Sequence, residues 1–263
     1  MNELLKEQYQ LIGDVAGYIR KKGWAESNAG NISVNVTDLL ASADLKEMSK
    51  SMFFELEKTL PALAQHVFMI TTGGSRMRHI HKKPEKHVCL VELNDTGKKY
   101  RLLYPGKVSN DAVPTSEMPA HLSVQDLLVR SGSSARAVLH AHVTETIALT
   151  HHPEYKSEKS INNLLWSMQP EMVMFLPNGI GYVPFQMPGS YDIAGETISK
   201  LRDHQAIIWE KHGCLTIGET LEGAFDTMEL IAKSIEIFFR CRAAGYDPQG
   251  LTKSQIETIR KSL

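Results

Sequence analysis

The sequence predicts an α/β protein whose helices and strands belong to a single domain, residues 1–263. Stretches with period-two alternation, such as NISVNV at 31–36, occur in the same chain as stretches with helical periodicity, such as 220–243. No proline- or glycine-rich linker separates the two kinds of segment. A hairpin signature and short strand-to-strand connections indicate a sheet that is largely antiparallel or mixed, not purely parallel.

The N-terminal part of the chain is expected to begin with a helix and to continue with four strands. Gly23 follows two lysines and ends the helix, one face of which collects Leu4, Leu5, Leu11, Ile12, Val15 and Ile19. The predicted strands are NISVNV, HVFMITTGG (66–74), HVCLVEL (87–93) and KKYRLLY. The last two flank NDTG, which is typical of a β-hairpin.

The middle of the chain is expected to alternate between helices and strands. Thr115 or Ser116 caps a helix that runs to about Val129, with Pro119 tolerated in its first turn. ARAVLHAHV is then a strand, after which Thr144 caps a short helix. EMVMFL and GIGYVPF are interpreted as short strands.

The C-terminal part is expected to contain three helices and two strands. Ser190 begins a helix, and AIIWE and CLTIG are strands on either side of KHG. A long amphipathic helix spans 220–243. Ser254 and Glu257 form a capping box for a final helix.

Composition and charge exclude several classes of protein. The chain of 263 residues has 42% hydrophobic and 22% charged residues with a formal net charge of −1, typical of a globular domain. We therefore expect neither a nucleic-acid binder nor a membrane-surface protein. The cysteines Cys89, Cys214 and Cys241 are odd in number and far apart, which favours a reducing compartment. The N-terminus lacks an apolar signal core, so we expect a cytoplasmic protein.

The stretch VLHAHVTETIALTHH contains four histidines in fifteen residues. In a strand, alternate side chains share a face, so His140 and His142 point the same way, roughly 6.5–7 Å apart along the chain. Val138 shares that face, while Leu139 takes the other. Taken alone, the pair is equally compatible with two histidines that face water at the end of a strand.

A third histidine favours a metal site. His212 occupies the tight turn KHG, where Gly213 permits a close backbone approach. Three histidines leave a fourth position open, the pattern of a catalytic rather than a structural zinc site. The remaining histidines, among them His121, are expected to be surface or structural residues.

A carboxylate and three small-residue turns complete the candidate site. Glu117 lies in VPTSEMPAH, where it is either a base beside the metal or an ordinary dipole-compensating residue of a first helical turn. The candidate anion-binding turns are SNAGN, TTGGSR and PTS, although each is also an ordinary turn. Their candidate ligand residues are Asn28, Asn31, Gly73, Gly74, Ser75, Thr115 and Ser116.

The order SNAGN, TGGS, PTSEMPAH, HAH, PNGIGYVPFQMPGS and KHG resembles the class II aldolase/adducin family from about residue 12 to residue 245. The resemblance implies a three-layer α/β/α fold around a central, mainly antiparallel sheet, and a homotetramer. It also implies one zinc ion per subunit, held by His140, His142 and His212, with Glu117 catalytic. Phosphate contacts are implied for the turn residues named above. Where the family often reads TGSG this chain has TGGS, so either Ser75 or the amide of Gly74 replaces the usual serine contact.

Two stretches, PTSE with PAH and the PxGxGxxP segment, point to the rhamnulose branch of the family. That branch implies reversible cleavage of L-rhamnulose 1-phosphate to dihydroxyacetone phosphate and L-lactaldehyde, in rhamnose catabolism. A second glutamate of the branch matches Glu171. Three alternatives stay open: another sugar-phosphate aldolase or 4-epimerase of the same fold, an adducin-like scaffold without activity, and a zinc hydrolase.

Overall fold

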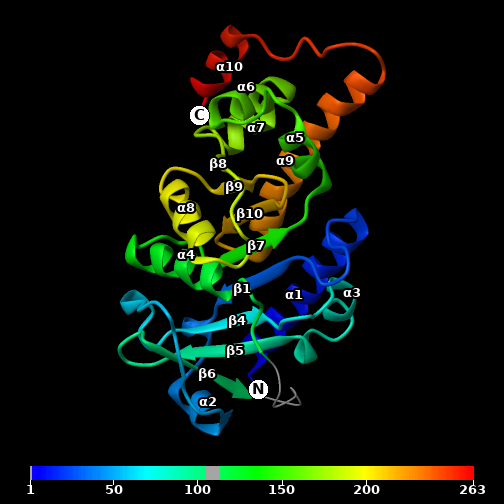
Figure 1. Ribbon diagram of the computed structural model, residues 1–263. Coiled ribbons are helices and arrows are strands. Elements are labelled where there is room, and N and C mark those ends of the chain that lie inside the picture. The colour runs from blue at the N-terminus through cyan, green and yellow to red at the C-terminus, as the bar shows by residue number, and fades with distance from the viewer. Residues whose placement is uncertain (1, 105–112) are drawn as a thin grey trace.

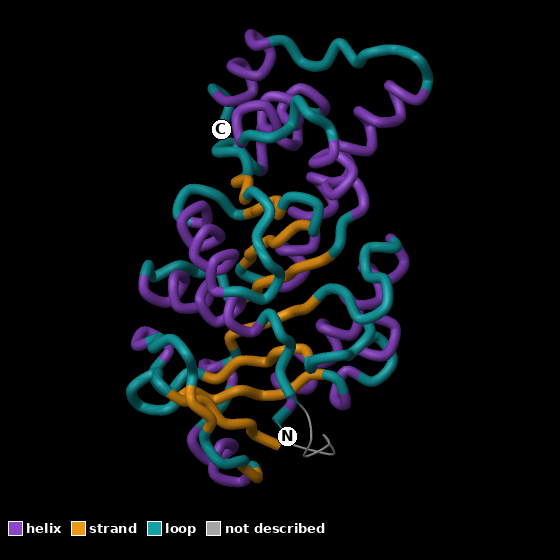
Figure 2. The backbone as a smooth tube through the Cα atoms, in the orientation of Figure 1, coloured by secondary structure: helices purple, strands orange, loops and turns teal. Residues whose placement is uncertain are grey.

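The computed structural model describes residues 2–104 and 113–263, and within them ten strands form one twisted sheet (Figures 1 and 2). The strands are β1 (Asn31–Asn35), β2 (Ser49–Lys50), β3 (Phe54–Glu55), β4 (Val67–Thr71), β5 (Val88–Leu93), β6 (Lys99–Tyr104), β7 (Ala137–Ala141), β8 (Gly181–Val183), β9 (Ala206–Trp209) and β10 (Gly213–Gly218). Their order is β2-β6-β5-β4-β1-β7-β10-β9-β8, with β3 also paired to β6. Only the β8–β9 pairing is parallel among the described strands, so the expected mainly antiparallel sheet is confirmed.

Helices cover both faces of this sheet, which makes the fold a three-layer α/β/α arrangement (Figure 1). The helices are α1 (Glu3–Lys22), α2 (Ser42–Glu47), α3 (Met77–Ile80), α4 (Met118–Arg130), α5 (Thr144–His151), α6 (Glu158–Met168), α7 (Pro170–Phe175), α8 (Tyr191–Leu201), α9 (Leu221–Ala243) and α10 (Lys253–Arg260). Short 3-10 turns lie at Thr37–Leu39, Pro61–Leu63 and Pro84–Lys86. Among the described residues, no helix combines the length and apolar character needed to cross a membrane.

The two faces of β7 show how strand alternation builds the layers. Leu139 and Ala141 pack in the core formed with α1 and α9. Val138 packs on the opposite face, in the core formed with α4 and α8. Burying such side chains stabilises the fold by about 25 cal/mol for each Å² of apolar surface removed from water. The alternation predicted for ARAVLHAHV is therefore confirmed, and it leaves His140 on the α4 side.

Several local predictions are confirmed by the structure. Helix α1 ends at Gly23, whose φ of 78° is the left-handed conformation that glycine adopts easily. β5 and β6 form the expected hairpin, and the amide of Gly97 closes its turn by donating to the carbonyl of Asn94. The hydroxyl of Ser190 caps α8, and the hydroxyl of Thr220 caps α9.

The interpretation of EMVMFL as a strand is wrong. Residues 170–175 form helix α7, which begins with Pro170 at its first position and buries Met172 and Val173. A short apolar run has no diagnostic period, and Pro170 is a favourable first residue of a helix. The helices α2, α3 and α6 were not predicted: α2 and α3 have only six and four residues, and the helical spacing of Ile161, Leu164 and Leu165 in α6 was not recognised.

The predicted caps of three helices are also wrong. Helix α4 begins later than expected, and its N-cap position is occupied by Glu117, with no capping bond from a side chain. Thr144 is the first residue of α5 and not its cap. Helix α10 has its capping box at Thr252 and Gln255, two residues before the predicted pair Ser254 and Glu257. Glu117 therefore occupies the N-cap position of α4, but its carboxylate makes no capping bond and instead accepts a hydrogen bond from Asn31.

Candidate metal centre and active site

Antiparallel pairing brings the start of β1, the end of β7 and the start of β10 together, at one end of these three central strands. His140 pairs with Asn31 of β1 on one side and with Leu215 of β10 on the other. His142 lies just beyond the end of β7, and His212 lies in the turn that precedes β10. The N-terminus of α4 lies at the same end of these strands, where Asn31 donates a hydrogen bond to Glu117.

The imidazoles of His140, His142 and His212 each offer a nitrogen, and these three atoms lie within 4.8 Å of one another. The Nδ1 of His140 lies 3.0 Å from the carbonyl oxygen of Cys214, which can only accept, so Nδ1 carries the hydrogen. The lone pair of His140 therefore resides on Nε2. That atom is buried and has no hydrogen-bond partner within the described residues. A buried acceptor without a partner, beside two further imidazoles, is what a zinc-type cation would satisfy.

Burial favours the neutral, metal-binding form of two of these rings. It lowers the pKa of His140 to about 3 and that of His212 to about 4, since the charged forms lose their hydration. Neighbouring imidazoles act in the same direction, His142 on His140 and His140 on His212. Both rings are thus uncharged at neutral pH and can offer a lone pair to a cation.

Close packing holds the rings in this arrangement. The indole of Trp209 lies against two of them, with ring centroids 4.5 Å from His140 and 5.1 Å from His212. Gly213 passes so close to the carbonyl oxygen of Ala141 that a Cβ there would clash with it. The close approach that the sequence led us to expect at Gly213 was to a metal, whereas the close approach in the structure is to the backbone of β7.

Glu26 orients the third histidine. Its carboxylate lies 2.6 Å from Nδ1 of His142, which leaves Nε2 of that ring to face the other two imidazoles. Partial burial is the largest single effect and raises the pKa of Glu26, but the hydrogen bond from His142, a backbone hydrogen bond and the electrostatic effect of His142 and His212 together hold the pKa below its usual range. Carboxylate–histidine pairs of this kind fix the orientation of a metal ligand. Glu26 was not predicted, although it precedes SNAGN directly.

The carboxylate of Glu117 lies between two of the histidines. Its Oε1 is 3.5 Å from Nε2 of His212, and its Oε2 is 3.6 Å from Nε2 of His140. Asn31 donates to Oε2 at 2.9 Å. Glu117 is 8% exposed and lines the adjoining cavity, so it is sheltered yet open to a bound molecule. A carboxylate so placed can exchange a proton with a ligand held at the metal.

The predicted anion-binding turns meet around a cavity of about 370 Å³ beside Glu117. Its lining includes Asn28, Asn31, Gly73, Gly74, Thr115 and Ser116. The amide of Gly73 donates to Val113, whereas the amide of Gly74 has no acceptor within the described residues. The turn therefore leaves one backbone donor for an anion. Such a cavity suits a small anionic ligand that also reaches the histidines.

Two predicted site residues lie apart from this cavity. Ser75 is adjacent, but its hydroxyl is engaged at 2.6 Å with Thr72 and at 3.0 Å with Nδ1 of His87. Of the alternatives left open for TGGS, the geometry favours the amide of Gly74. Glu171 lies on α7 and lines a different cavity with Asp226. Within one chain, the structure does not bring Glu171 to the histidines.

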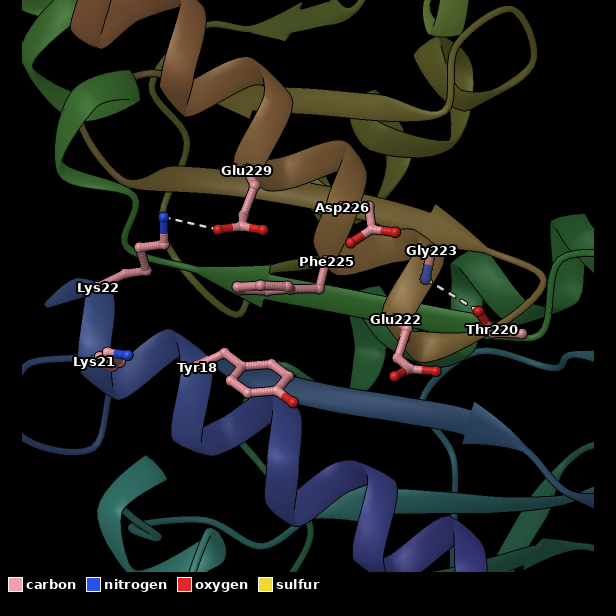
Figure 3. Close-up of a pocket in the computed structure, with 9 residues that line it drawn as sticks. All are labelled: Tyr18, Lys21, Lys22, Thr220, Glu222, Gly223, Phe225, Asp226 and Glu229. Atoms are coloured by element: carbon pink, nitrogen blue, oxygen red, sulfur yellow. Dashed lines mark hydrogen bonds and ion pairs between the residues drawn. The ribbon is translucent and has the colours of Figure 1, made fainter.

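A larger cavity of about 920 Å³ lies between α1 and α9 (Figure 3). Lys22 pairs with Glu229 at 2.7 Å, so the charges of these two side chains offset one another. The ring of Tyr18 and the acidic side chains of Glu222 and Asp226 complete much of the lining. We therefore place the candidate site at the cavity beside the histidines, although the cavity between α1 and α9 is larger.

Comparison with known proteins agrees with this geometry. Residues 10–239 match the model of the family described as Class II Aldolase and Adducin N-terminal domain. The chain therefore belongs to the class II aldolase and adducin family.

Relatives within that family include sugar-phosphate aldolases. Rhamnulose-1-phosphate aldolase of Bacteroides thetaiotaomicron is 34% identical over 97% of this chain and 93% of its own length. Rhamnulose-1-phosphate aldolase of Klebsiella pneumoniae subsp. pneumoniae is 29% identical over 91% and 87%. The crystal structure of a sugar-phosphate aldolase from Thermotoga maritima superposes with a TM-score of 0.80 and 28% identity, covering 94% of this chain and 99% of that one. These findings support an aldehyde-lyase of the class II type.

Proposed function

We propose that this chain, folded as one domain, is a zinc-dependent aldolase that reversibly cleaves L-rhamnulose 1-phosphate to dihydroxyacetone phosphate and L-lactaldehyde. The observation that carries the proposal is the unpartnered Nε2 of His140 beside two further imidazoles, with the Glu117 carboxylate 3.6 Å away. The names of the relatives support the substrate. The site then serves rhamnose breakdown, and the three unpaired cysteines suit the cytoplasm.

His140, His142 and His212 would hold the zinc ion. When bound there, the ion would act as a Lewis acid toward the ketone and hydroxyl oxygens of the substrate. Glu117 takes a proton from the carbon beside the ketone in the direction of synthesis and returns it in the direction of cleavage. Its place between two ligands keeps the carboxylate at the reacting carbon. General acid–base catalysis of this kind contributes about 10²–10⁴-fold to the rate.

The turns around the cavity would bind the phosphate group. Asn28, Gly74 and Ser116 line the exposed side of the cavity, away from the buried His140. A phosphate held there positions the ketone toward the histidines, and correct positioning lowers the barrier by reducing the entropy lost in the reaction. Residues on the exposed side of the cavity would thus bind the phosphate, while Glu117 on the buried side would transfer the proton.

A coupled assay for dihydroxyacetone phosphate tests the proposal. The purified protein is given a panel of 6-deoxyketose 1-phosphates, with and without a chelator. We expect the highest kcat/KM with L-rhamnulose 1-phosphate and loss of activity with the chelator. Preference for the fuculose diastereomer, or isomerisation of a pentulose 5-phosphate at C4, would instead assign another activity of the same fold. Binding without turnover would indicate a scaffold, and incorporation of solvent oxygen would indicate a hydrolase.

A role for Glu171 requires a second chain, because its side chain lies outside the histidine cavity of its own subunit. We propose that the enzyme is a homotetramer in which Glu171 reaches the site of a neighbour. Glu171 and the nearby Met174 and Phe175 are exposed in the single chain, and such apolar exposure is typical of an interface. Mixed tetramers of Glu117→Gln and Glu171→Ala chains should then recover activity that neither variant shows alone. If the mixture is no more active than its parts, Glu171 does not act across subunits.

A further inference from the structure

A ladder of buried polar side chains connects α4 to β1 directly behind the site. Glu117, His121 and Gln125 recur every four residues, so they share one face at the start of α4. Asn31 and Ser33 are two residues apart on β1 and share the face that looks toward α4. The spacing of neighbouring groups on a helix face, about 6 Å, is close to the two-residue spacing on a strand. The two rows therefore interdigitate.

The contacts of the ladder run without interruption from Gln125 to Glu117. Gln125 contacts Ser33 at 3.3 Å, and Ser33 contacts Nδ1 of His121 at 2.8 Å. Nε2 of His121 is hydrogen-bonded to Oδ1 of Asn31. The amide nitrogen of Asn31 then contacts Oε2 of Glu117 at 2.9 Å. His121, Ser33 and Gln125 are 0–2% exposed, so water cannot easily replace these partners.

A backbone carbonyl sets the direction of donation along the ladder. Nε2 of Gln125 lies 3.0 Å from the carbonyl oxygen of Arg136, which can only accept, so this atom is the amide nitrogen and also donates to Ser33. One of the two lone pairs of the Ser33 hydroxyl accepts from Gln125, and Nδ1 of His121 is the one acceptor that this hydroxyl contacts among the described residues, so Ser33 donates to Nδ1. The hydrogen of the neutral imidazole is then on Nε2 and is donated to Asn31.

The orientation of the Asn31 amide follows from that tautomer. Its oxygen accepts from His121, so its nitrogen must face Glu117 and donate to the carboxylate. In the reverse orientation, the amide oxygen of Asn31 would face the carboxylate oxygen, and two acceptors would repel one another. Burial lowers the pKa of His121 to about 4, which keeps this ring neutral and able to accept from Ser33 at neutral pH.

We infer that His121 is a positioning residue: its Nε2–H orients the Asn31 amide, which in turn holds the Glu117 carboxylate between the metal-binding histidines. The inference rests on the proposed role of Glu117 and adds to it a residue that does not touch the substrate. His121 lies one helical turn beyond Glu117, so the same helix supplies the base and the group that orients it. Small misplacements of a catalytic group can cost about 10²-fold in rate.

A matched pair of substitutions tests the inference. The amide of a His121→Gln variant can reach the position of Nε2 and donate to Asn31, whereas that of His121→Asn reaches only the position of Nδ1. We expect His121→Asn to lower kcat at least about tenfold with KM changed less than about threefold, and His121→Gln to keep at least about a third of wild-type kcat. Zinc content, measured on the same samples, should be unchanged. Equal kcat in the two variants, or loss of zinc in proportion to activity, would overturn the inference.

A double variant separates positioning of Glu117 from a general structural role. If His121 acts only through Glu117, adding His121→Asn to Glu117→Gln should lower kcat by less than about twofold. A further tenfold loss would show that His121 acts elsewhere. Wild-type kcat in Glu117→Gln alone would instead refute the proposed function, so the two failures are distinguishable.

Nitrogen-15 shifts of His121 in the wild-type, zinc-loaded enzyme provide a readout that needs no variant to fold. A neutral Nε2–H tautomer at neutral pH is expected. An Nδ1–H tautomer or a charged ring would contradict the direction of the ladder. Ser33→Ala, which removes a small hydroxyl and leaves the imidazole in place, should shift that tautomer signal and lower kcat less than His121→Asn does.

Discussion

Two cavities among the described residues differ in kind. The one between α1 and α9 measures about 920 Å³ and is lined largely by charged side chains, among them the ion pair of Lys22 and Glu229. The one beside β7 measures about 370 Å³ and is lined by histidines, a buried glutamate and small-residue turns. In the larger cavity Lys22 and Glu229 neutralise one another. Next to the smaller one, 3.6 Å from the Glu117 carboxylate, the buried Nε2 of His140 has no hydrogen-bond partner within the described residues.

The difference shows that unsatisfied, preorganised polar groups locate a site better than volume does. An exposed ion pair contributes about 0–1 kcal/mol and is already balanced. A buried acceptor without a partner is costly, and it persists where a ligand satisfies it or where the fold forces it. Four predictions test this contrast between the cavities, ordered from the largest expected effect to the smallest.

Removing a metal ligand should have the largest effect. In His142→Ala, we expect metal affinity to fall more than about 100-fold, beyond the 10–100-fold seen for residues that only orient a ligand, and activity to be lost with it. Metal content after dialysis and the aldolase assay measure the two effects. His79→Ala, an exposed histidine on α3, is the control and should keep both. Stoichiometric zinc in His142→Ala would show that another residue is the ligand.

Removing only the charge of the proposed base should separate binding from turnover. Glu117→Gln keeps the shape of the side chain, so we expect zinc to stay bound while kcat falls at least about tenfold. The three imidazoles still provide the ligands. Steady-state kinetics with metal analysis on the same preparation gives both values. Unchanged turnover would remove Glu117 from the proposed mechanism.

Glu26→Gln should weaken metal binding without abolishing it. The carboxylate that holds Nδ1 of His142 is replaced by an amide, and we expect zinc affinity to fall by about tenfold. The side chain of Glu26 is 69% exposed, so water can partly take its place and the loss stays at the low end of the range. Competition with a fluorescent chelator measures the affinity. An affinity equal to that of the wild type would mean that the pair does not orient His142.

The smallest effect is expected in the larger cavity. Glu229→Gln breaks the pair with Lys22, whose side chains are 47% and 38% exposed, so the free energy of unfolding should change by no more than about 1 kcal/mol. Neither kcat nor zinc affinity should change by more than about twofold, because neither Lys22 nor Glu229 lines the cavity beside the metal-binding histidines. A large loss of turnover in this variant would contradict the assignment of catalysis to the smaller cavity alone, and would give the larger cavity a part in the reaction.

Local patterns were sufficient to predict most elements that carry the site. Alternation in ARAVLHAHV placed His140 and His142 on one side, and the turn KHG placed His212 between two strands. Strand alternation and turns depend on residues that are close together in the chain, so a single sequence is enough to predict them. The resemblance to a family supplied the role of Glu117, which periodicity alone left open between a base and an ordinary residue of a first helical turn.

Other features were not visible before the chain was folded. The pattern of EMVMFL fits a strand as well as a helix. Packing against the core that includes α9 selects the helix α7. His121 looked like any structural histidine, although its four-residue spacing from Glu117 and Gln125 was a signal that could have been used. Glu26 gave no signal, because its partner His142 is 116 residues away.

The sequence by itself determined which side chains share a face of each strand and helix, and hence which chemistry each element can offer. Tertiary structure decided which of these faces meet. His140 and the carbonyl of Cys214 are 74 residues apart in the chain but 3.0 Å apart in space, and that contact selects the nitrogen left for a metal. The physical reason is that backbone geometry sets directions over a few residues. Distances between remote segments depend on strand pairing and on the burial of both faces of the sheet.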